Sequence, residues 1–314
     1  MASSRYLITG GAGFIGSNIA EALIQRGETV RIFDNFLTGR QANLAVVQGD
    51  VECIQGDLRN FADVKAAMQG VEVVLHQAAL ASVPRSIAYP IESLETNING
   101  TQHVLLAARD AGVRRVVYAS SSSIYGDTPT LPKHEQMQPS PMSPYAVHKL
   151  TGELLCKTFT RLYGLETVAL RYFNVFGPRQ DPASEYAAVI PRFLTALLRG
   201  QKPVVFGDGE QTRDFTYIAN VVQANLLAAT STKAVGHALN IGCGEQISLN
   251  TVLRLAGELL AVTPEIDYRA PRPGDVRASL ADISLARQLL DYQPAVEFRT
   301  GLALTLDALR EEVA

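Results

Sequence analysis

The hydrophobic positions in the first half of the chain follow two alternating periods. Short runs rich in β-branched and aromatic residues are separated by longer segments in which apolar residues recur at helical spacing, as at Ile15, Ile19, Ala22 and Leu23. The runs that predict strands are Arg5–Thr9, Thr29–Phe33, Val51–Gln55, Glu72–His76, Arg115–Ala119 and Glu166–Arg171. Strands that alternate with helices in this way predict an α/β fold of the Rossmann type, with a doubly wound parallel sheet.

The pattern changes at about Asn174, where Pro and Gly become frequent and the apolar runs become shorter. We therefore expect one domain over residues 1–173 and a smaller α/β lobe over residues 174–314, with a return to the first domain at about 213–243. Ser248 is expected to cap an amphipathic helix, and a last helix is expected from about Thr300 to Leu309.

Composition narrows the range of functions. The chain has 314 residues, of which 47% are hydrophobic and 19% charged, as is usual for a globular protein. A formal net charge of −3 offers no basic surface for nucleic acid, and Arg114-Arg115 is interpreted as part of a solvated loop. The sequence shows no export signal and no apolar run of membrane-spanning length. These features indicate a cytoplasmic protein that binds a small molecule.

The cysteines and histidines predict no metal site. Cys53, Cys156 and Cys243 are widely spaced, which favours reduced, packed thiols over disulfides. The histidines share no spacing typical of metal ligands.

A glycine-rich segment, Gly10-Gly11-Ala12-Gly13-Phe14-Ile15-Gly16, follows the first expected strand and opens the first helix. Its glycines let the backbone approach a pyrophosphate at the positive end of the helix. Asp34 ends the second expected strand, where a carboxylate accepts hydrogen bonds from ribose hydroxyls and repels a 2′-phosphate. The combination predicts NAD, and nearby Arg40 keeps NADP as the alternative.

Two further segments follow expected strands, Asp57-Leu58 after the third and Gln77-Ala78-Ala79 after the fourth. Both fall at strand carboxyl ends, where an open α/β sheet binds its ligands. For Asp57, a helix N-cap is an equally simple explanation.

Tyr145 and Lys149 stand one helical turn apart in the segment Tyr-Ala-Val-His-Lys, so both side chains share a helix face. A nearby positive charge favours the phenolate form of a tyrosine. We therefore expect Lys149 to lower the pKa of Tyr145, which would then serve as a base for the oxidation of an alcohol.

Together these motifs resemble the extended short-chain dehydrogenase/reductase family, in which the glycine turn, the acid after the second strand and Tyr-x-x-x-Lys occur in this order. More closely, the chain is similar to nucleotide-sugar 4-epimerases, and among them to bacterial UDP-N-acetylglucosamine 4-epimerases, through the segments His76–Ser86, Arg171–Gly177 and Gly207–Gly209. The resemblance covers nearly the whole chain. It implies that residues 1–173 bind NAD and that residues 174–314 bind the substrate.

The resemblance also implies the reaction. NAD oxidises the sugar 4-hydroxyl, the 4-keto sugar turns over in the site, and the hydride returns to the opposite face of the ring. Tyr145 would remove the hydroxyl proton, and Ser121 would hydrogen-bond the same oxygen. In the family the active hydroxyl precedes a Tyr-Gly pair at a fixed spacing, and Tyr125 here selects Ser121 from four consecutive serines, with Ser122 expected to touch the substrate.

By the same resemblance, the expected cofactor contacts are Gly10, Gly13, Phe14, Ile15, Gly16, Asp34, Asn35, Asp57, Leu58, Gln77, Ala78, Ala79, Tyr145, Lys149 and Tyr172. The expected substrate contacts are Ser82, Ser86, Ser122, Asn174, Ala188, Val189, Arg213, Arg272, Asp275 and Ser279. Asn174 and the two arginines would hold the phosphates. An ion pair with Asp214 or Asp208 is the alternative for Arg213.

Two features bear on the substrate and the reaction type. Dehydratases of the family carry Thr-Asp-Glu where this chain has Ser121-Ser122-Ser123, and decarboxylases usually carry Thr-Ser-Glu, so epimerisation is favoured. Ser279 stands where epimerases restricted to glucose and galactose commonly have a tyrosine, which leaves room for an N-acetyl group. The alternatives are a UDP-glucose 4-epimerase, a UDP-glucuronate 4-epimerase and, from a different class, a non-catalytic NAD-binding redox sensor.

Assembly is also implied by the resemblance. The segments Glu95–Gly112 and Ser143–Leu162 correspond to helices that pair across a two-fold axis in the family, which implies a homodimer with a four-helix interface. Their apolar residues could equally pack on the sheet, so the sequence leaves the choice open: Ile98, Val104, Leu105, Leu150, Leu154 and Leu155.

Overall fold

A seven-stranded parallel sheet forms the centre of the protein in the computed structural model, which describes residues 5–45, 47, 51–181, 188–271 and 276–313. The strands are β1 (Tyr6–Thr9), β2 (Val30–Asp34), β3 (Val51–Gln55), β4 (Val73–His76), β5 (Arg115–Ser121), β6 (Glu166–Tyr172) and β11 (Ala238–Ile241). Their spatial order is β11-β6-β5-β4-β1-β2-β3, and every pairing is parallel. The predicted fold class is confirmed, and the order reverses between β1 and β4, where such sheets open a crevice for ligands.

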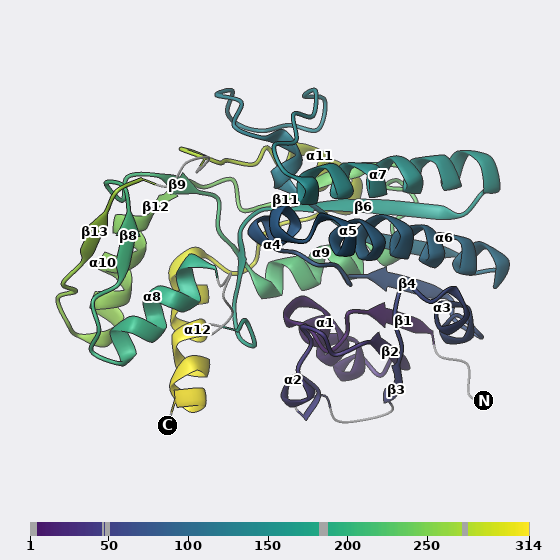
Figure 1. Cartoon of the computed structure of the whole chain (residues 1–314), viewed down its shortest axis with the longest axis horizontal. Helices are drawn as coiled ribbons and strands as arrows, with labels where there is room; N and C mark the ends of the chain where they lie inside the picture. The colour runs from purple at the N-terminus through teal and green to yellow at the C-terminus, as the bar shows by residue number, and fades with distance from the viewer. Residues whose placement is uncertain (1–4, 46, 48–50, 182–187, 272–275, 314) are drawn as a thin grey trace.

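Helices cover both faces of the sheet (Figure 1). They are α1 (Phe14–Gln25), α2 (Gln41–Ala45), α3 (Phe61–Ala67), α4 (Val83–Ala88), α5 (Pro90–Leu94), the π-helical turn η1 (Glu95–Asn99), α6 (Gly100–Asp110), the 3₁₀ turn η2 (Ser122–Tyr125), α7 (Pro144–Tyr163), α9 (Ile218–Thr230) and α11 (Ser284–Leu290). Two separate apolar cores result: α1 and α9 pack on one face, and α3, α6 and α7 pack on the other.

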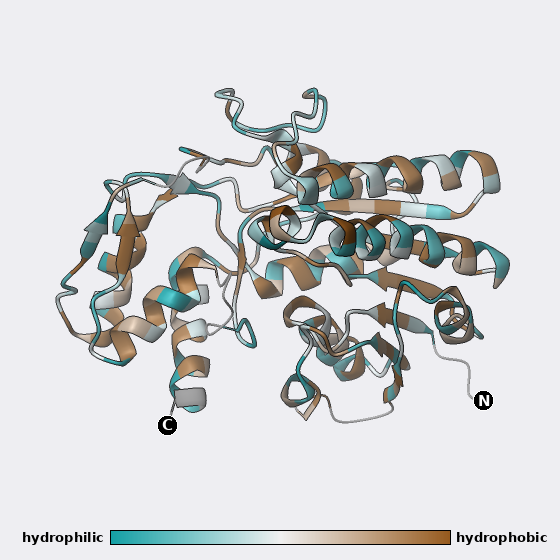
Figure 2. Ribbon diagram, viewed as in Figure 1, coloured by the Kyte–Doolittle hydropathy of each residue, from teal (hydrophilic) through white to brown (hydrophobic). Residues whose placement is uncertain are grey.

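Strand side chains alternate between these two cores. Leu7 and Val116 belong to the core under α3, α6 and α7, whereas Ile8 and Val117 belong to the core under α1 and α9. The strands are therefore apolar on both faces, and β1 and β4 are accordingly mostly brown in Figure 2. This double burial explains why the strand runs stand out in the sequence.

A second group of elements lies beside the sheet in Figure 1. It contains α8 (Val189–Leu198), α10 (Leu249–Leu260), α12 (Phe298–Val313), β8 (Val204–Phe206), β9 (Thr212–Arg213), β12 (Ile247–Ser248) and β13 (Asp267–Arg269). The short strands β7 (Val175–Phe176) and β10 (Thr216–Tyr217) pair with each other near the start of this group. The domain boundaries expected from the sequence stay a prediction.

The expected helices of this group are present. The Ser248 hydroxyl accepts a hydrogen bond from the Thr251 amide at 3.1 Å, which confirms the predicted cap of α10. The last helix, α12, is longer than the predicted span at both ends. Along the described part of the chain, no helix combines the length and the apolar character needed to cross a membrane.

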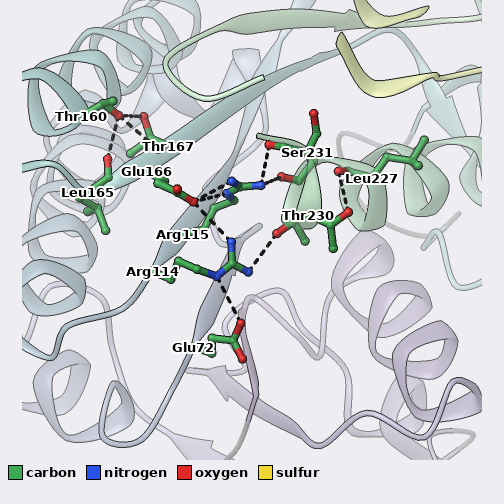
Figure 3. Close-up of polar contacts among 12 residues, drawn as sticks. Glu72, Arg114, Arg115, Thr160, Leu165, Glu166, Thr167, Leu227, Thr230 and Ser231 are labelled. Atoms are coloured by element: carbon green, nitrogen blue, oxygen red, sulfur yellow. Dashed lines mark hydrogen bonds and ion pairs between the residues drawn. The ribbon is translucent and has the colours of Figure 1, made fainter. Parts of the chain in front are cut away.

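Arg115 contradicts the interpretation of Arg114-Arg115 as a solvated loop. It begins β5 and is fully buried. Its guanidinium donates to Glu166 on β6 at 2.6 Å and to the carbonyls of Ala228 and Ser231 at 3.0 and 2.7 Å, at the end of α9 (Figure 3). A cation at this position satisfies carbonyls that the helix leaves without partners. Arg114, by contrast, is partly exposed.

Arg115→Met is expected to lower the free energy of unfolding by about 2–4 kcal/mol, because it leaves the carbonyls of Ala228 and Ser231 without this buried donor and leaves Glu166 with only the longer bond from Arg114 at 3.4 Å. Arg114→Met is the matched control on the neighbouring residue. About 1 kcal/mol or less is expected for it, because the contacts of Arg114 with Glu72, Glu166 and the Ala229 carbonyl are longer, at 3.2–3.4 Å, and partly exposed. Urea unfolding of both variants measures the difference. Equal losses for the two variants would contradict the capping role of Arg115.

Candidate functional site

The glycine turn after β1 contains two glycines that the fold itself requires. Gly10 has a φ of +69°, and a Cβ there would come within 2.7 Å of the Ala78 backbone. A Cβ at Gly16 would collide with the carbonyl oxygen of Gly10. Gly13 differs, because a Cβ there would have one protein neighbour within 4 Å, the Gly10 oxygen at 3.1 Å. The open space in front of Gly13 is a cradle that a side chain would fill.

A cleft with about 900 Å³ of empty space, open to solvent, lies in front of this turn. It follows the carboxyl ends of β1 to β4, as expected for this sheet order. Twelve of the residues predicted to contact the cofactor line it: Gly10, Gly13, Phe14, Ile15, Gly16, Asp34, Asn35, Asp57, Leu58, Gln77, Ala78 and Ala79. The sequence missed further lining residues, among them Leu37, Thr38 and Thr96. Leu37 and Thr38 follow Asp34 closely, whereas Thr96 comes from the distant turn η1 and carries no sequence signal.

Asp34 is fixed within this cleft by the backbone. Its carboxylate accepts hydrogen bonds from the amides of Ala12 at 2.9 Å and Phe36 at 2.8 Å. Burial raises the pKa of Asp34, and these hydrogen bonds act in the opposite direction. Each oxygen keeps further acceptor capacity, which suits the ribose hydroxyls of a dinucleotide.

Asp57 holds a cation at the edge of the cleft. Arg59 donates to it through the backbone amide and the guanidinium, and these bonds hold the pKa of Asp57 well below its usual range. Asn35 donates to the same carboxylate at 3.0 Å. The N-cap of α3 is Asn60, so the alternative explanation of Asp57 as the cap is wrong.

Gln77 and Tyr172 meet where the sheet order reverses. The Tyr172 hydroxyl lies 3.1 Å from the side-chain oxygen of Gln77, and Asn225 on α9 bonds to both residues. This partly buried triangle joins the end of β4 to β6 and α9, so it fixes two of the predicted cofactor contacts relative to each other.

Ser121, Tyr145 and Lys149 meet at the end of β5 and the start of α7. Ser121 hydrogen-bonds the phenol of Tyr145. The Lys149 ammonium donates to the Ala119 carbonyl at 2.6 Å and lies 5.8 Å from the centre of the Tyr145 ring. All three predicted catalytic residues therefore share one locality, formed by two adjacent elements.

The pKa values of Tyr145 and Lys149 differ from the expectation that the lysine lowers the pKa of the tyrosine. Burial raises the pKa of Tyr145 to about 12, and the hydrogen bond from Ser121 opposes the shift. Burial also lowers the pKa of Lys149 to about 7. The lysine does not convert the tyrosine into a phenolate in the protein alone, because the buried site disfavours charge on both groups.

Ser86 is buried and acts on the protein backbone. Its hydroxyl donates to the Val83 carbonyl at 2.7 Å and accepts from the Tyr145 amide at 3.1 Å. This amide lies in the first turn of α7, so it has no acceptor within the helix. Ser86 thus sets the position of Tyr145, and its expected contact with the substrate stays a prediction. Ser82 caps α4 through the Arg85 amide.

A second cavity lies in the group of elements beside the sheet, where residues of β7, α8, β8, β9 and the start of α10 line it. Four predicted substrate contacts line it, namely Asn174, Ala188, Val189 and Arg213. Phe176, Arg192, Phe206, Gln211 and Phe215, which the sequence did not single out, also line it. The cavity combines apolar walls with two arginines, as a nucleotide with charged phosphates requires.

Asn174 connects this cavity to Ser279. Its φ is +33°, and its side chain donates to the Asp214 carbonyl at 3.0 Å and to the Ser279 hydroxyl at 3.2 Å. Ser279 therefore adjoins the cavity. Arg272 and Asp275, predicted from the same segment, lie outside the described residues.

The carboxylates suggested as partners of Arg213 have other donors. Asp214 is fully buried and accepts from the amides of Cys243, Gly244 and Ala281 at 2.8–3.0 Å. Asp208 pairs with Arg277 at 2.9 Å.

Ser122 begins the turn η2, directly after Ser121.

The residues of the first cleft fit NAD. The space at Gly13 would admit a pyrophosphate at the start of α1, and Asp34, which lines the same cleft, would accept hydrogen bonds from a ribose. Arg40 is directed to another segment, because it lies 3.4 Å from the Arg179 carbonyl and 3.9 Å from Asp181. A carboxylate without a cation beside it disfavours the 2′-phosphate of NADP.

Comparisons with known proteins agree with this site. Residues 6–242 match the model of the NAD-dependent epimerase/dehydratase family. The UDP-glucose 4-epimerase of Mycolicibacterium smegmatis is 36% identical over 317 residues, which cover 98% of this chain and 99% of the relative.

Two solved structures are similar over nearly their whole length. A UDP-N-acetylglucosamine 4-epimerase from Methanobrevibacter ruminantium, in complex with UDP-N-acetylmuramic acid, is 39% identical with a TM-score of 0.94 and covers 99% of this chain and 100% of its own. A UDP-glucose 4-epimerase from Thermus thermophilus, in complex with NAD, is 37% identical with a TM-score of 0.89 and covers 98% of this chain and 99% of its own.

Gly13→Ala is expected to leave the fold intact and to weaken NAD binding by roughly 10-fold or more, because the new methyl group enters the space of the pyrophosphate. Gly16→Ala is the matched control, and it should destabilise the protein itself through its collision with Gly10. Thermal unfolding without cofactor and calorimetric titration with NAD separate the two effects. Unchanged NAD affinity in Gly13→Ala would exclude this placement of the pyrophosphate.

Proposed function

The chain belongs to the NAD-dependent epimerase/dehydratase family, and we propose that it is a UDP-N-acetylglucosamine 4-epimerase that interconverts UDP-N-acetylglucosamine and UDP-N-acetylgalactosamine. The observation that carries the proposal is the meeting of Ser121, Tyr145 and Lys149 at the end of β5, next to strands whose carboxyl ends line the cofactor cleft. Its relatives support an NAD-dependent nucleotide-sugar epimerase, and the choice of sugar is the finer part of the proposal.

The protein's part in the reaction is proton transfer and positioning. NAD, when bound, supplies the hydride acceptor and a positively charged ring. Tyr145 takes the proton of the sugar 4-hydroxyl and later returns it, while Ser121 hydrogen-bonds the same oxygen. Because burial raises the pKa of Tyr145 to about 12, the phenolate forms only when positive charge is present near it.

Lys149 supplies part of that charge. The Ala119 carbonyl holds its ammonium in place, so the side chain loses little freedom when the substrate binds. Ser86 fixes the backbone at Tyr145, which keeps the phenol aligned while the sugar turns over.

The second cavity is suited to the nucleotide end of the substrate. Arg192 and Arg213 line it, and their guanidinium groups can neutralise two phosphates, while Asn174 lines the same cavity. Ser279 adjoins Asn174, and with a sugar bound here as proposed, its small side chain would leave space beside C2 for an N-acetyl group.

The same geometry leaves room for UDP-glucose and UDP-galactose, so a UDP-glucose 4-epimerase is the second candidate. The relative from Mycolicibacterium smegmatis, named for that activity, favours it. A UDP-glucuronate 4-epimerase would need, in addition, a polar pocket for the carboxylate at C6 of the sugar. A redox sensor would need NAD but not the three catalytic residues.

We also propose a homodimer, because α5 and α7 expose apolar side chains. Ile91 is 74% exposed, Leu154 is 58% exposed, and Val147 is 44% exposed. Val104 and Leu105, which the sequence left open, are buried in the core and are not available for pairing. A second copy of the chain would cover the exposed residues, and the solution mass of the purified protein tests this assembly.

Incubation of the purified protein with UDP-N-acetylglucosamine is expected to yield the galacto epimer without added NAD, as chromatography of the nucleotide sugars will measure. Tyr145→Phe should lose activity by roughly 100-fold or more, since the phenol is the proton acceptor. A panel with UDP-glucose and UDP-glucuronate ranks the candidates. A stable NAD complex that converts none of these sugars would favour the sensor.

Ser279→Tyr is expected to reduce turnover of UDP-N-acetylglucosamine by roughly 10-fold or more while sparing UDP-glucose, because the ring occupies the space of the N-acetyl group. Ser279→Ala is the control, since it removes the hydroxyl bonded to Asn174 without filling the space. The ratio of kcat/KM for the two sugars is the measurement. An equal loss on both sugars would remove Ser279 from the sugar pocket.

A further inference from the structure

A buried carboxylate lies one helical turn beyond Lys149 on α7, and no step of the proposed reaction uses it. It belongs to Glu153, which is 8% exposed. We propose that Glu153 is a positioning residue, which keeps Lys149 charged and fixes the face of α7 that carries Tyr145. The proposal deepens the function proposed above and rests on it for the role of Lys149.

The contacts of Glu153 tie together three elements of the site. Ser120 on β5 donates to its carboxylate at 2.5 Å, and Arg171 on β6 donates through two nitrogens at 2.9 and 2.7 Å. Ser120 and Arg171 stand opposite each other in the β5–β6 pair, and the next pair is Ser121 and Tyr172. Glu153 thus anchors α7 directly behind two predicted site residues.

Lys149 and Glu153 reach consecutive residues of β5. The Lys149 ammonium bonds to the Ala119 carbonyl, and Glu153 bonds to the Ser120 hydroxyl. Residues four apart on a helix are neighbours, so the ammonium and the carboxylate lie on one face. Arg171 approaches the carboxylate from β6 and also donates to Tyr125 at 2.7 Å. The carboxylate therefore faces a cation on each side.

Glu153 is the carboxylate among the groups that surround Lys149. The titratable or charged groups around Lys149 come from four elements. They are Tyr145, His148, Glu153 and Cys156 from α7, Tyr118 from β5, His76 from β4 and, behind Glu153, Arg171 from β6. Burial lowers the pKa of Lys149, and Cys156 and Glu153 oppose this.

The other groups bring no negative charge to Lys149. Burial raises the pKa of the Cys156 thiol far above its usual range, so that the thiol stays neutral. Burial lowers the pKa of His76 to about 3, so that this imidazole is also neutral at pH 7. Glu153 is the group that offsets the desolvation of the ammonium.

The test compares Glu153→Gln, which keeps the shape of the side chain and removes its charge, with the unmodified protein. The pKa of Lys149 is read from the ¹³Cε signal of lysine-labelled full-length protein, assigned by its loss in Lys149→Met. We expect a fall of about one pH unit in Glu153→Gln. The alkaline limb of kcat/KM should move to lower pH by the same amount, because the active site needs a charged Lys149.

Two further variants separate charge from folding. Glu153→Gln leaves Arg171 buried without an anion, which can unfold the chain, whereas Glu153→Gln/Arg171→Gln replaces the pair as a unit. The double variant should fold and should still lower the pKa of Lys149. Ser120→Ala keeps both charges, so that this pKa should remain unchanged.

An unchanged Lys149 signal in both Gln variants would overturn the proposal, as would a loss of activity that is uniform in pH. Because the signal does not depend on turnover, a protein that epimerises no UDP-sugar would refute the proposed function alone.

Discussion

The close packing of α7 on β5 is the constraint on which the proposed site depends. Gly152 makes this packing possible, because a Cβ at that position would overlap the ring of Tyr118. At this separation, side chains from one face of α7 reach the backbone and hydroxyl groups at the end of β5. Tyr145, Lys149 and Glu153 follow one another at one-turn spacing, so a single rigid contact between helix and strand sets the positions of all three. The sheet contributes the other half of the site, because its parallel strands deliver their carboxyl ends to the same edge.

Buried charged side chains join the sheet to the helices on both of its faces. Arg115 joins β5 to the end of α9, and the pair of Glu153 and Arg171 joins α7 to β5 and β6 behind the site. A buried ion pair adds little net stability, because desolvation consumes most of the attraction. Its geometric effect is larger: each guanidinium is a planar fork whose donors must meet acceptors in fixed directions. Both pairs therefore determine how the elements align more than how strongly the chain folds.

The sequence predicts the part of this structure that depends on local patterns. Strands buried on both faces produce apolar runs, and the turn at Gly10 requires glycine for steric reasons, so both are visible in one dimension. The clustering of Asp34 with the residues that follow β3 and β4 was predictable, because parallel strands end at one edge. The burial of Arg115 and the bond from Ser86 to the helix carrying Tyr145 were not, since each depends on a partner distant in sequence. The short edge strand β11 was missed as a strand because its few residues carry no distinct period.

The opposite pKa shifts of Tyr145 and Lys149 explain why a buried base needs a surrounding charge pattern. Burial raises the pKa of the phenol to about 12 and lowers that of the ammonium to about 7, so both groups are driven toward their neutral forms. A neutral pair is stable but is a poor base. Near pH 7 the ammonium is close to its midpoint, and small charges in its surroundings decide its state. Glu153 contributes a fixed negative charge, whereas a cationic cofactor contributes a positive charge only while it is bound. In the proposed reaction, the same helix face would therefore be inactive without the cofactor and basic with it, with no change of fold.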